Sequence, residues 1–377
     1  MQTRKTLPKG SSLFTFLGGK EIMAQILMGT GLLLVVLALF TLFSYKAPQG
    51  MKAMGALASA ACASFLVEAF HASLFGQQMG IDFLAQVGGA NGSLGGVAAG
   101  ILVPLALGVS PVYAVLVGLS VSGFGILPGF VAGYLISFVV KFLEEKVPAG
   151  LDLIVIILVA APLSRAIAMG MDPVVNGTLK QIGQVLIQAS SGSGLTSQII
   201  MGIILGGIIT VVATAPLSSM ALTAIISLTG TPMAIGALAV FGSSFMNFVF
   251  FSKMKFGSKK DTISVAIEPL TQSDIISANP IPVFVTNFIG GALSGLVVAL
   301  VSYFVSPITI SQPGLATPIA GFAVAVGQNG TPALIAAAGC VVVSVAAGFL
   351  GHAMFKNYNI KTADEIRGTK EDSTQAA

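Results

Sequence analysis

Residues 275–355 read IISANPIPVFVTNFIGGALSGLVVALVSYFVSPITISQPGLATPIAGFAVAVGQNGTPALIAAAGCVVVSVAAGFLGHAMF and contain no Asp, Glu, Lys or Arg. Ile22–Tyr45 and Gln181–Ser252 also lack these residues, and Met54–Val140 contains only two of them. A soluble domain needs charge on its surface, whereas a membrane-spanning helix needs about 20 mostly apolar residues. Each long stretch suffices for several crossings. The sequence therefore predicts an all-α, polytopic membrane protein.

The composition supports this class and excludes others. Hydrophobic residues make up 55% of the 377 residues and charged residues only 8%, while glycine occurs 45 times. Abundant glycine is typical of membrane helices that pack closely or break. Period-two alternation is weak, which argues against a β-barrel. The net charge of +4 comes from short polar segments, so it indicates membrane topology and no nucleic-acid partner.

We expect eight to ten crossings and one or two re-entrant hairpins. Gln77–Gly96 is rich in glycine and amides, so it is predicted to be a non-helical segment buried at membrane depth. Asp172–Ser190 has apolar residues at helical spacing and is predicted to be an amphipathic helix on the membrane surface. The predicted spans are Ile22–Tyr45, Met54–Gly76, Val97–Leu119, Val121–Phe142, Leu153–Met169, Ser197–Gly230 (broken near Pro216), Pro232–Ser252, Thr286–Val305 and Pro332–Phe355.

Two segments mix prolines and polar residues with apolar runs too short to span. Thr262–Phe284 reads TISVAIEPLTQSDIISANPIPVF, and Pro307–Thr331 reads PITISQPGLATPIAGFAVAVGQNGT. Irregular backbone at membrane depth is tolerated only where protein buries it or a cavity borders it. Both segments are therefore predicted to be re-entrant hairpins.

The polar segments suggest the domain organisation. Residues 1–20 form a basic tail without a cleavable signal and residues 356–377 a charged tail, both expected in the cytoplasm. The Lys253–Lys260 loop has four lysines and should lie on the same side. Between the tails we expect one membrane domain, 21–355, with N-terminal helices and the amphipathic segment in about 21–190 and the hairpins in about 191–355.

No catalytic motif is present. The sequence lacks GxxxxGK[ST], GxSxG, CxxC and HExxH motifs, and its only histidines are His71 and His352. We therefore predict no catalytic residue, phosphorylation site, metal site or cofactor on this chain. Isolated polar residues in apolar surroundings remain as candidates.

The first candidates are Glu68 and His71, which are three residues apart and would share one face of an α-helix. They could line a polar cavity, bind hydroxyl groups or relay protons. Alternatively, they satisfy each other or lie near the membrane surface.

Glu268 is the second candidate, in the middle of the first predicted hairpin. Together with Thr271, Gln272 and Asn279 it would present hydrogen-bonding groups at the tip of a broken helix, where transporters commonly bind substrate. The alternative is a hydrated loop in which Glu268 is simply solvated.

Amides are the third candidates. Asn91, Asn247, Gln328 and Asn329 stand beside glycine or small residues, and such uncharged groups suit a neutral, polyhydroxylated ligand. Turn formation explains Asn91 and Asn329 equally well. Because Asn247 lies mid-span, a bond to another helix is favoured there. Arg165, near the end of a span, is expected to snorkel to the interface; the alternatives are pairing with Asp152 or Asp172 and binding of an anionic substrate.

From about Gly19 to Ala353 the chain resembles the integral-membrane IIC component of the bacterial sugar phosphotransferase system, and more narrowly a stand-alone IIC-like family. The resemblance rests on GLDLIVIILVAAPLSRAIA at Gly150–Ala168, the DPVVNGTLKQIGQVL that follows, Ile263–Gly295, where Asn279 precedes Pro280, and ITISQPGLATPIAGF at Ile308–Phe322.

This resemblance implies a homodimeric carrier of a sugar or polyol in the bacterial plasma membrane, working by an elevator-type movement. In the family, an acidic residue of a re-entrant hairpin binds sugar hydroxyls, and Glu268 occupies the comparable place, although without the Gly-Ile-Thr-Glu motif. Phosphorylation would require soluble IIA and IIB partners, since no such domain is present here. Two other functions stay open: a proton-coupled secondary transporter and a ligand-sensing regulatory membrane protein.

Overall fold

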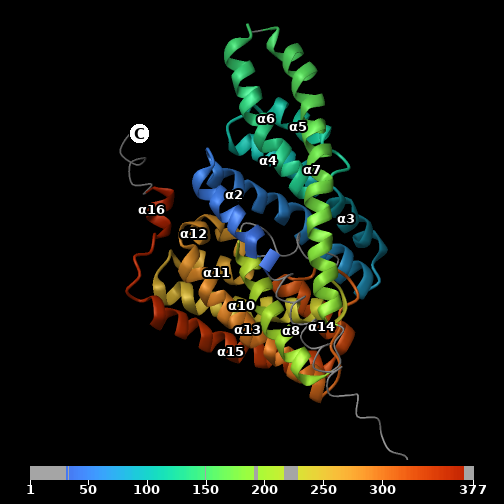
Figure 1. Ribbon diagram of the computed structural model, residues 1–377, viewed down its shortest axis with the longest axis vertical. Coiled ribbons are helices and arrows are strands. Elements are labelled where there is room, and N and C mark those ends of the chain that lie inside the picture. The colour runs from blue at the N-terminus through green and yellow to red at the C-terminus, as the bar shows by residue number, and fades with distance from the viewer. Residues whose placement is uncertain (1–30, 33, 149, 191–193, 216–227, 369–377) are drawn as a thin grey trace, which may run out of the picture.

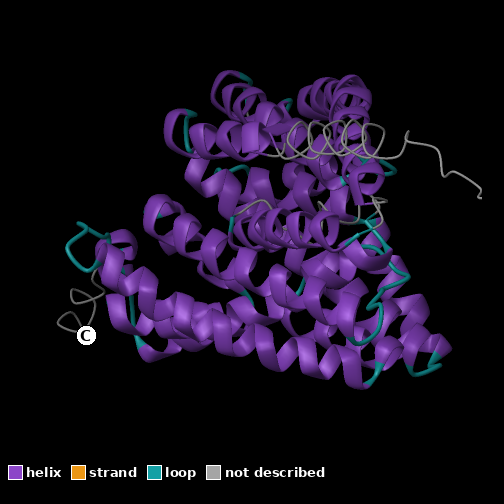
Figure 2. Ribbon diagram, turned by 60° about the horizontal axis from the view of Figure 1, so that its bottom comes forward, coloured by secondary structure: helices purple, strands orange, loops and turns teal. Residues whose placement is uncertain are grey.

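The computed structural model describes residues 31–32, 34–148, 150–190, 194–215 and 228–368 (Figure 1). Within these residues the regular structure is helical, and only an isolated antiparallel bridge joins Gly230 to Ile310 (Figure 2). Seven described helices are long and apolar enough to cross a membrane, or eight if one bent pair forms a single span. This confirms the predicted all-α, polytopic class. The described residues contain seven or eight candidate spans, whereas eight to ten crossings were expected for the chain.

A short apolar helix, Leu34–Lys46, leads into the first group of helices. α2 and two π-helical segments, η1 and η2, together form one candidate span over Gly50–Gln78. α3 and α4 follow and meet at a bend of 53°. The group consists of α2 (Gly50–Ala61), η1 (Cys62–Leu66), η2 (Glu68–Gln78), α3 (Asp82–Ser93), α4 (Gly95–Ala106), α5 (Pro111–Ser120), α6 (Ile126–Lys146) and α7 (Asp152–Ser190).

The second group contains four long helices packed against one another, with shorter helices attached. It consists of α8 (Leu195–Thr214), α10 (Gly230–Met254), α11 (Lys259–Ile267), the 3-10 turn η3 (Pro269–Gln272), α12 (Ser273–Ala278), α13 (Pro280–Phe304), α14 (Pro318–Asn329), α15 (Thr331–Phe355) and α16 (Ala363–Arg367).

Figure 1 shows the two groups one above the other, with α4, α5 and α6 in the upper part and α10, α13 and α15 in the lower. The two groups meet mainly where α2 and η2 touch η3, α12 and α14. The hairpin segments of the second group therefore form much of its contact with the first group.

Glycine allows the long helices of the second group to touch backbone to backbone. A Cβ atom at Gly295 of α13 would overlap the carbonyl oxygen of Gly202 in α8, and one at Gly206 would overlap that of Gly291. At the same crossing, the Thr210 hydroxyl donates a 2.8 Å hydrogen bond to the Asn287 carbonyl. Close approach of this kind is how helices associate where lipid removes the hydrophobic drive between them.

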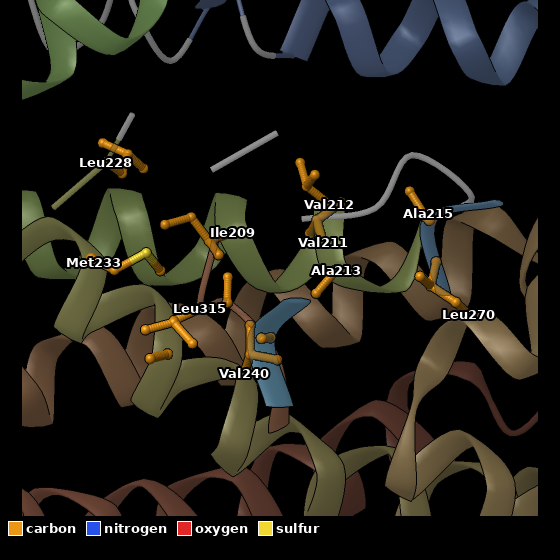
Figure 3. Packing of buried hydrophobic residues seen from close by; sticks show 14 of the residues in the cluster. Ile209, Val211, Val212, Ala213, Ala215, Leu228, Met233, Val240, Leu270 and Leu315 are labelled. Carbon is orange, nitrogen blue, oxygen red and sulfur yellow. The ribbon is translucent and has the colours of Figure 1, made fainter. Parts of the chain in front are cut away.

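The first predicted hairpin is present as a helix–turn–helix, α11–η3–α12. Its tip is anchored by Leu270, which is 4% exposed and belongs to the main apolar cluster. Figure 3 shows Leu270 next to Ala215, at the end of α8. In the second predicted hairpin, Pro307–Thr331, an irregular segment leads into α14. The depth of both hairpins in the membrane stays a prediction.

Gln77–Gly96 was predicted to be non-helical, and this was wrong for most of it, because α3 occupies Asp82–Ser93. Its glycines serve packing against η2: a Cβ atom at Gly88 would overlap Ala72, and one at Gly76 would overlap Ala85. Glycine costs about 1 kcal/mol in a helix. Close helix–helix contact offsets that cost, which local propensity alone does not show.

The predicted break between a span at Leu153–Met169 and a separate amphipathic helix is absent, because α7 runs through both for 39 residues. Pro162 and Pro173 lie inside this helix, and neither ends it. Membrane helices tolerate proline where other groups satisfy the freed carbonyl. Whether the end of α7 follows the membrane surface stays a prediction.

Two other predicted spans also change. Val97–Leu119 is interrupted, since α4 ends at Ala106 and α5 begins at Pro111. α8 ends at Thr214, just before the predicted break at Pro216, and residues 216–227 lie outside the described residues.

We expect Gly295→Ala to lower the free energy of unfolding by about 1–3 kcal/mol, the usual effect of overpacking a close contact. Gly170→Ala is the control, because Gly170 lies exposed in α7 with nothing within 4 Å of the added atom. Thermal unfolding of the purified variants in detergent measures the difference. Equal unfolding temperatures for the two variants would contradict the backbone contact between α8 and α13.

Candidate substrate site

Glu268 lies at the reversal of the first hairpin, between α11 and η3. Its backbone is extended and Pro269 fills the first position of η3, where a missing N–H is harmless. The Glu268 N–H closes α11 by donating to the Ser264 carbonyl at 2.9 Å, and the Thr271 hydroxyl donates to the Glu268 carbonyl at 2.7 Å. The sequence Glu-Pro-Leu-Thr thus forms a tight turn that holds the carboxyl group in place.

The Glu268 carboxyl group is buried and only partly hydrogen-bonded. The residue is 6% exposed, and Oε1 accepts a long hydrogen bond of 3.4 Å from the Leu270 N–H. Oε2 is fully buried and has no hydrogen-bond partner within the part of the chain that the structure describes. Buried polar atoms in native proteins are almost always hydrogen-bonded, so an exception calls for an explanation such as a ligand or a water molecule.

Three segments come together around this carboxyl group. Thr317, which precedes α14 and is 2% exposed, lies close enough to lower the pKa of Glu268. From the first group of helices, α2 contacts η3, and the Cys62 thiol directly after α2 lies near enough to interact electrostatically with Glu268. The carboxyl group therefore stands where the hairpin tip, the start of α14 and the first group of helices meet.

Burial governs the electrostatics of this site. Glu268 lies between the candidate spans, and burial raises the pKa of its carboxyl from the ordinary 4.5 to about 7. The Leu270 N–H and the Thr317 hydroxyl oppose this shift only in part. Because the value lies near neutral pH, the carboxyl can hold or release a proton under ordinary conditions.

The other predicted residues of this hairpin differ in their surroundings. Thr271 is exposed and bonds to Glu268, while Gln272 is buried and its Oε1 accepts a 2.8 Å bond from Arg367. The Asn279 amide donates to the carbonyls of Ile275 and Lys361 and accepts from the Lys361 N–H. Asn279 therefore holds the C-terminal segment, and a role in substrate binding stays only a prediction.

Glu68 and His71 do not share a face, because the helix between them is π-helical and its turn is wider than that of an α-helix. The carboxyl group of Glu68 lies against Gly92, where an added Cβ atom would overlap it. The His71 ring packs edge-on against Phe75, and its Nδ1 lies 3.2 Å from the Val67 carbonyl. The prediction of a shared helix face was wrong for this reason.

Two of the amide candidates, Asn91 and Asn247, make hydrogen bonds to groups of the helices. Asn91 donates to the Val87 carbonyl at 2.9 Å within its own helix. Asn247 is fully buried and accepts a 3.0 Å hydrogen bond from Asn287, the cross-helix bond that its mid-span position suggested. Both residues therefore bond inside the protein, but Asn247 Nδ2 is buried without a partner among the described residues.

Gln328 and Asn329 lie at the far end of α14 from Thr317, and a helix of 12 residues spans roughly 18 Å. Asn329 accepts from the Thr309 N–H at 2.9 Å and Gln328 from the Ser311 N–H at 3.0 Å. These amides hold the irregular segment before α14 in place, away from Glu268.

Arg165 donates from Nη1 to the carbonyls of Ser120 and Ser122, both at 3.1 Å. It thus binds the carbonyl end of α5, where a cation is favourable. The expected pairing with Asp152 or Asp172 is not found among the described contacts of these residues, since Asp152 accepts from Tyr113 and Asp172 from Asn176.

Sequence reasoning missed Thr317 and Cys62. The pair Thr317-Pro318 is a signal for the start of a helix and could have marked Thr317. For Cys62, nothing in the sequence indicates its proximity to a residue that follows it by some 200 positions.

These features define a multi-pass helical membrane protein with a buried, partly unsatisfied carboxyl group where two groups of helices meet. The family model for the phosphotransferase system component EIIC matches residues 51–367, so the chain belongs to that family. The match confirms the resemblance seen in the sequence. It identifies the chain as a permease-type membrane component of the phosphotransferase class. Neither the comparison with curated proteins nor that with solved structures gave a match.

We expect the raised pKa of Glu268 to appear in the pH dependence of stability. Because the folded protein holds this proton up to pH of about 7, and the unfolded chain only up to about 4.5, stability should fall as the pH rises between these values. Glu268→Gln should lack this contribution. The difference between the unfolding temperatures of the two proteins, measured from pH 4 to 8, tests this, and a constant difference would contradict the shift.

Proposed function

We propose that this protein is the permease subunit of a phosphotransferase-type system, which binds a small neutral polar solute, a sugar or polyol, at Glu268 and carries it across the bacterial plasma membrane. The observation that carries the proposal is the buried Oε2 atom of Glu268, which has no partner among the described residues. A substrate hydroxyl would supply the missing hydrogen bond.

The chemistry of the surrounding groups suits hydroxyl groups. A carboxylate accepts several hydrogen bonds, and Thr317 adds a group that both donates and accepts. Gln272 and Thr271 follow within four residues of Glu268 and bring further uncharged groups to the tip. We do not include the other predicted residues in this group around Glu268. They are Glu68, His71, Asn91, Asn247, Asn279, Gln328 and Asn329.

The arrangement of the helices supports an elevator-type movement. The two groups touch mainly through α2 and η2 on one side and η3, α12 and α14 on the other. A substrate held at this boundary could be carried by one group sliding past the other. We further propose a homodimer as the working unit and soluble IIA and IIB partners as the phosphoryl source, both as the family implies.

One observation favours a second candidate function, a proton-coupled transporter on the same scaffold. The Glu268 pKa of about 7 allows the carboxyl to change charge during a transport cycle. Uptake into proteoliposomes without a phosphoryl donor, abolished by a proton uncoupler, would favour this candidate over the phosphotransferase subunit.

We expect Glu268→Gln to weaken substrate binding by up to about 1.5–3 kcal/mol, the range for a hydrogen bond to a charged group. The measurement is a thermal-shift screen of the purified protein against sugars and polyols, since a bound ligand stabilises the folded state. Glu145→Gln is the matched control, because Glu145 is exposed at the end of α6. A ligand that stabilises the Glu268→Gln variant as strongly as the unchanged protein would remove Glu268 from the site.

A further inference from the structure

The C-terminal segment after α15 crosses the hairpin that contains Glu268. Lys361 exchanges two backbone hydrogen bonds of 2.8 Å with the Asn279 amide. The Ala363 N–H donates to the Phe256 carbonyl at 2.7 Å, and Ala363 is 3% exposed in an apolar cluster with Phe251 and Ile275. The chain from Lys361 to Arg367 is therefore fastened to the hairpin and is not a free tail.

Arg367 ends this segment and binds three hairpin residues with one guanidinium group. Nη1 donates to Asp261 at 2.7 Å, and Nε and Nη2 donate to the two oxygens of Asp274 at 2.7 and 3.1 Å. Nη2 also donates to Gln272 Oε1 at 2.8 Å. The three acceptors lie in α11, α12 and η3, so one side chain connects both arms of the hairpin and its tip.

The charges explain why an arginine suits this place. Asp261 and Asp274 come from different helices, and a fork of several fixed donors can bind both carboxylates at once. Burial raises the pKa of Asp261, but hydrogen bonds from Ser258 and Arg367 outweigh it, and the pKa lies below its ordinary value. Asp261 is thus ionised, and without Arg367 two carboxylates would face each other across the hairpin.

The link to the substrate site runs through Gln272. This residue ends η3, the four-residue turn that begins directly after Glu268. Holding Gln272 Oε1 fixes the far end of the turn, while Leu270 in its middle is anchored in the apolar cluster. The turn that positions the Glu268 carboxyl is therefore fixed at its middle and at its end.

We propose that Arg367 is a positioning residue of the substrate site: its hydrogen bonds connect the two arms of the hairpin and so hold Glu268 in its binding position. The inference rests on the proposed function. A site held rigid before binding loses less conformational freedom when the ligand arrives, and its affinity is higher for that reason.

The native cysteines allow a test that needs no ligand. Cys62 is partly exposed and directly follows α2, which contacts η3 and α12 of the hairpin, whereas Cys340 is fully buried in α15. In Arg367→Gln, Cys62 should react with N-ethylmaleimide at least about tenfold faster, because even one lost hydrogen bond to a charged group shifts the opening equilibrium about tenfold. Cys340 should react at its original rate, since only the hairpin loosens.

The control is Lys356→Gln, which removes one positive charge from an exposed position of the same segment. It should leave the labelling of Cys62 unchanged. A second variant, Asp274→Asn, keeps the ion pair between Arg367 and Asp261. It should raise the labelling rate of Cys62 by a smaller factor, and it keeps the test available should Arg367→Gln fail to fold. Slower labelling in the double variant Arg367→Gln/Asp274→Asn than in Arg367→Gln would show that repulsion between the Asp261 and Asp274 carboxylates contributes to the loosening of the hairpin.

The outcomes separate this inference from the proposed function. Faster labelling of Cys62 alone, together with sugar binding weakened about tenfold in Arg367→Gln, supports the positioning role. Unchanged labelling and affinity in Arg367→Gln, with binding weakened in Glu268→Gln, would overturn the inference and leave the proposed function intact. Equal acceleration at Cys62 and Cys340 would show general unfolding and would also overturn it. Binding unaffected by Glu268→Gln would refute the proposed function itself.

Discussion

The Glu268 carboxyl is removed from water at the boundary between the two helix groups, so the protein must hold it with its own groups. Removing an ionised carboxyl from water is costly unless hydrogen bonds or opposite charges replace the lost solvent. Here the Leu270 N–H supplies one long bond and the Thr317 hydroxyl lies nearby, while Oε2 has no partner among the described residues. The folded protein thus keeps an unsatisfied acceptor at the boundary between its two helix groups, and binding of a hydroxylated ligand would relieve that cost.

Keeping such a group in place requires a rigid frame, and small residues supply it. Gly202 and Gly295 bring α8 and α13 into backbone contact, and Gly88 brings α3 onto η2. These contacts leave no room for a side chain, so each crossing has one arrangement. The hairpin is supported on one side by α8 through Leu270 and on the other by the C-terminal segment through Arg367.

The membrane class, the position of the hairpin and the candidacy of Glu268 could be predicted from the sequence. Each depends on a local signal: charge-free runs, or a carboxylate beside proline between short apolar pieces. α3 could not be predicted, because its glycines are favourable only against η2. The prediction that Glu68 and His71 share a helix face was wrong, because a π-helix changes the angular spacing of residues. Thr317, Cys62 and Arg367 reach Glu268 or its hairpin across long sequence distances, which no local pattern encodes.

The most direct test of the central claim is an experimental structure of the purified protein with a stabilising sugar or polyol bound. The account predicts a ligand hydroxyl within about 3 Å of Glu268 Oε2, where the hairpin tip and the start of α14 meet the first group of helices. A ligand bound elsewhere, with Oε2 hydrogen-bonded to a protein group, would contradict it.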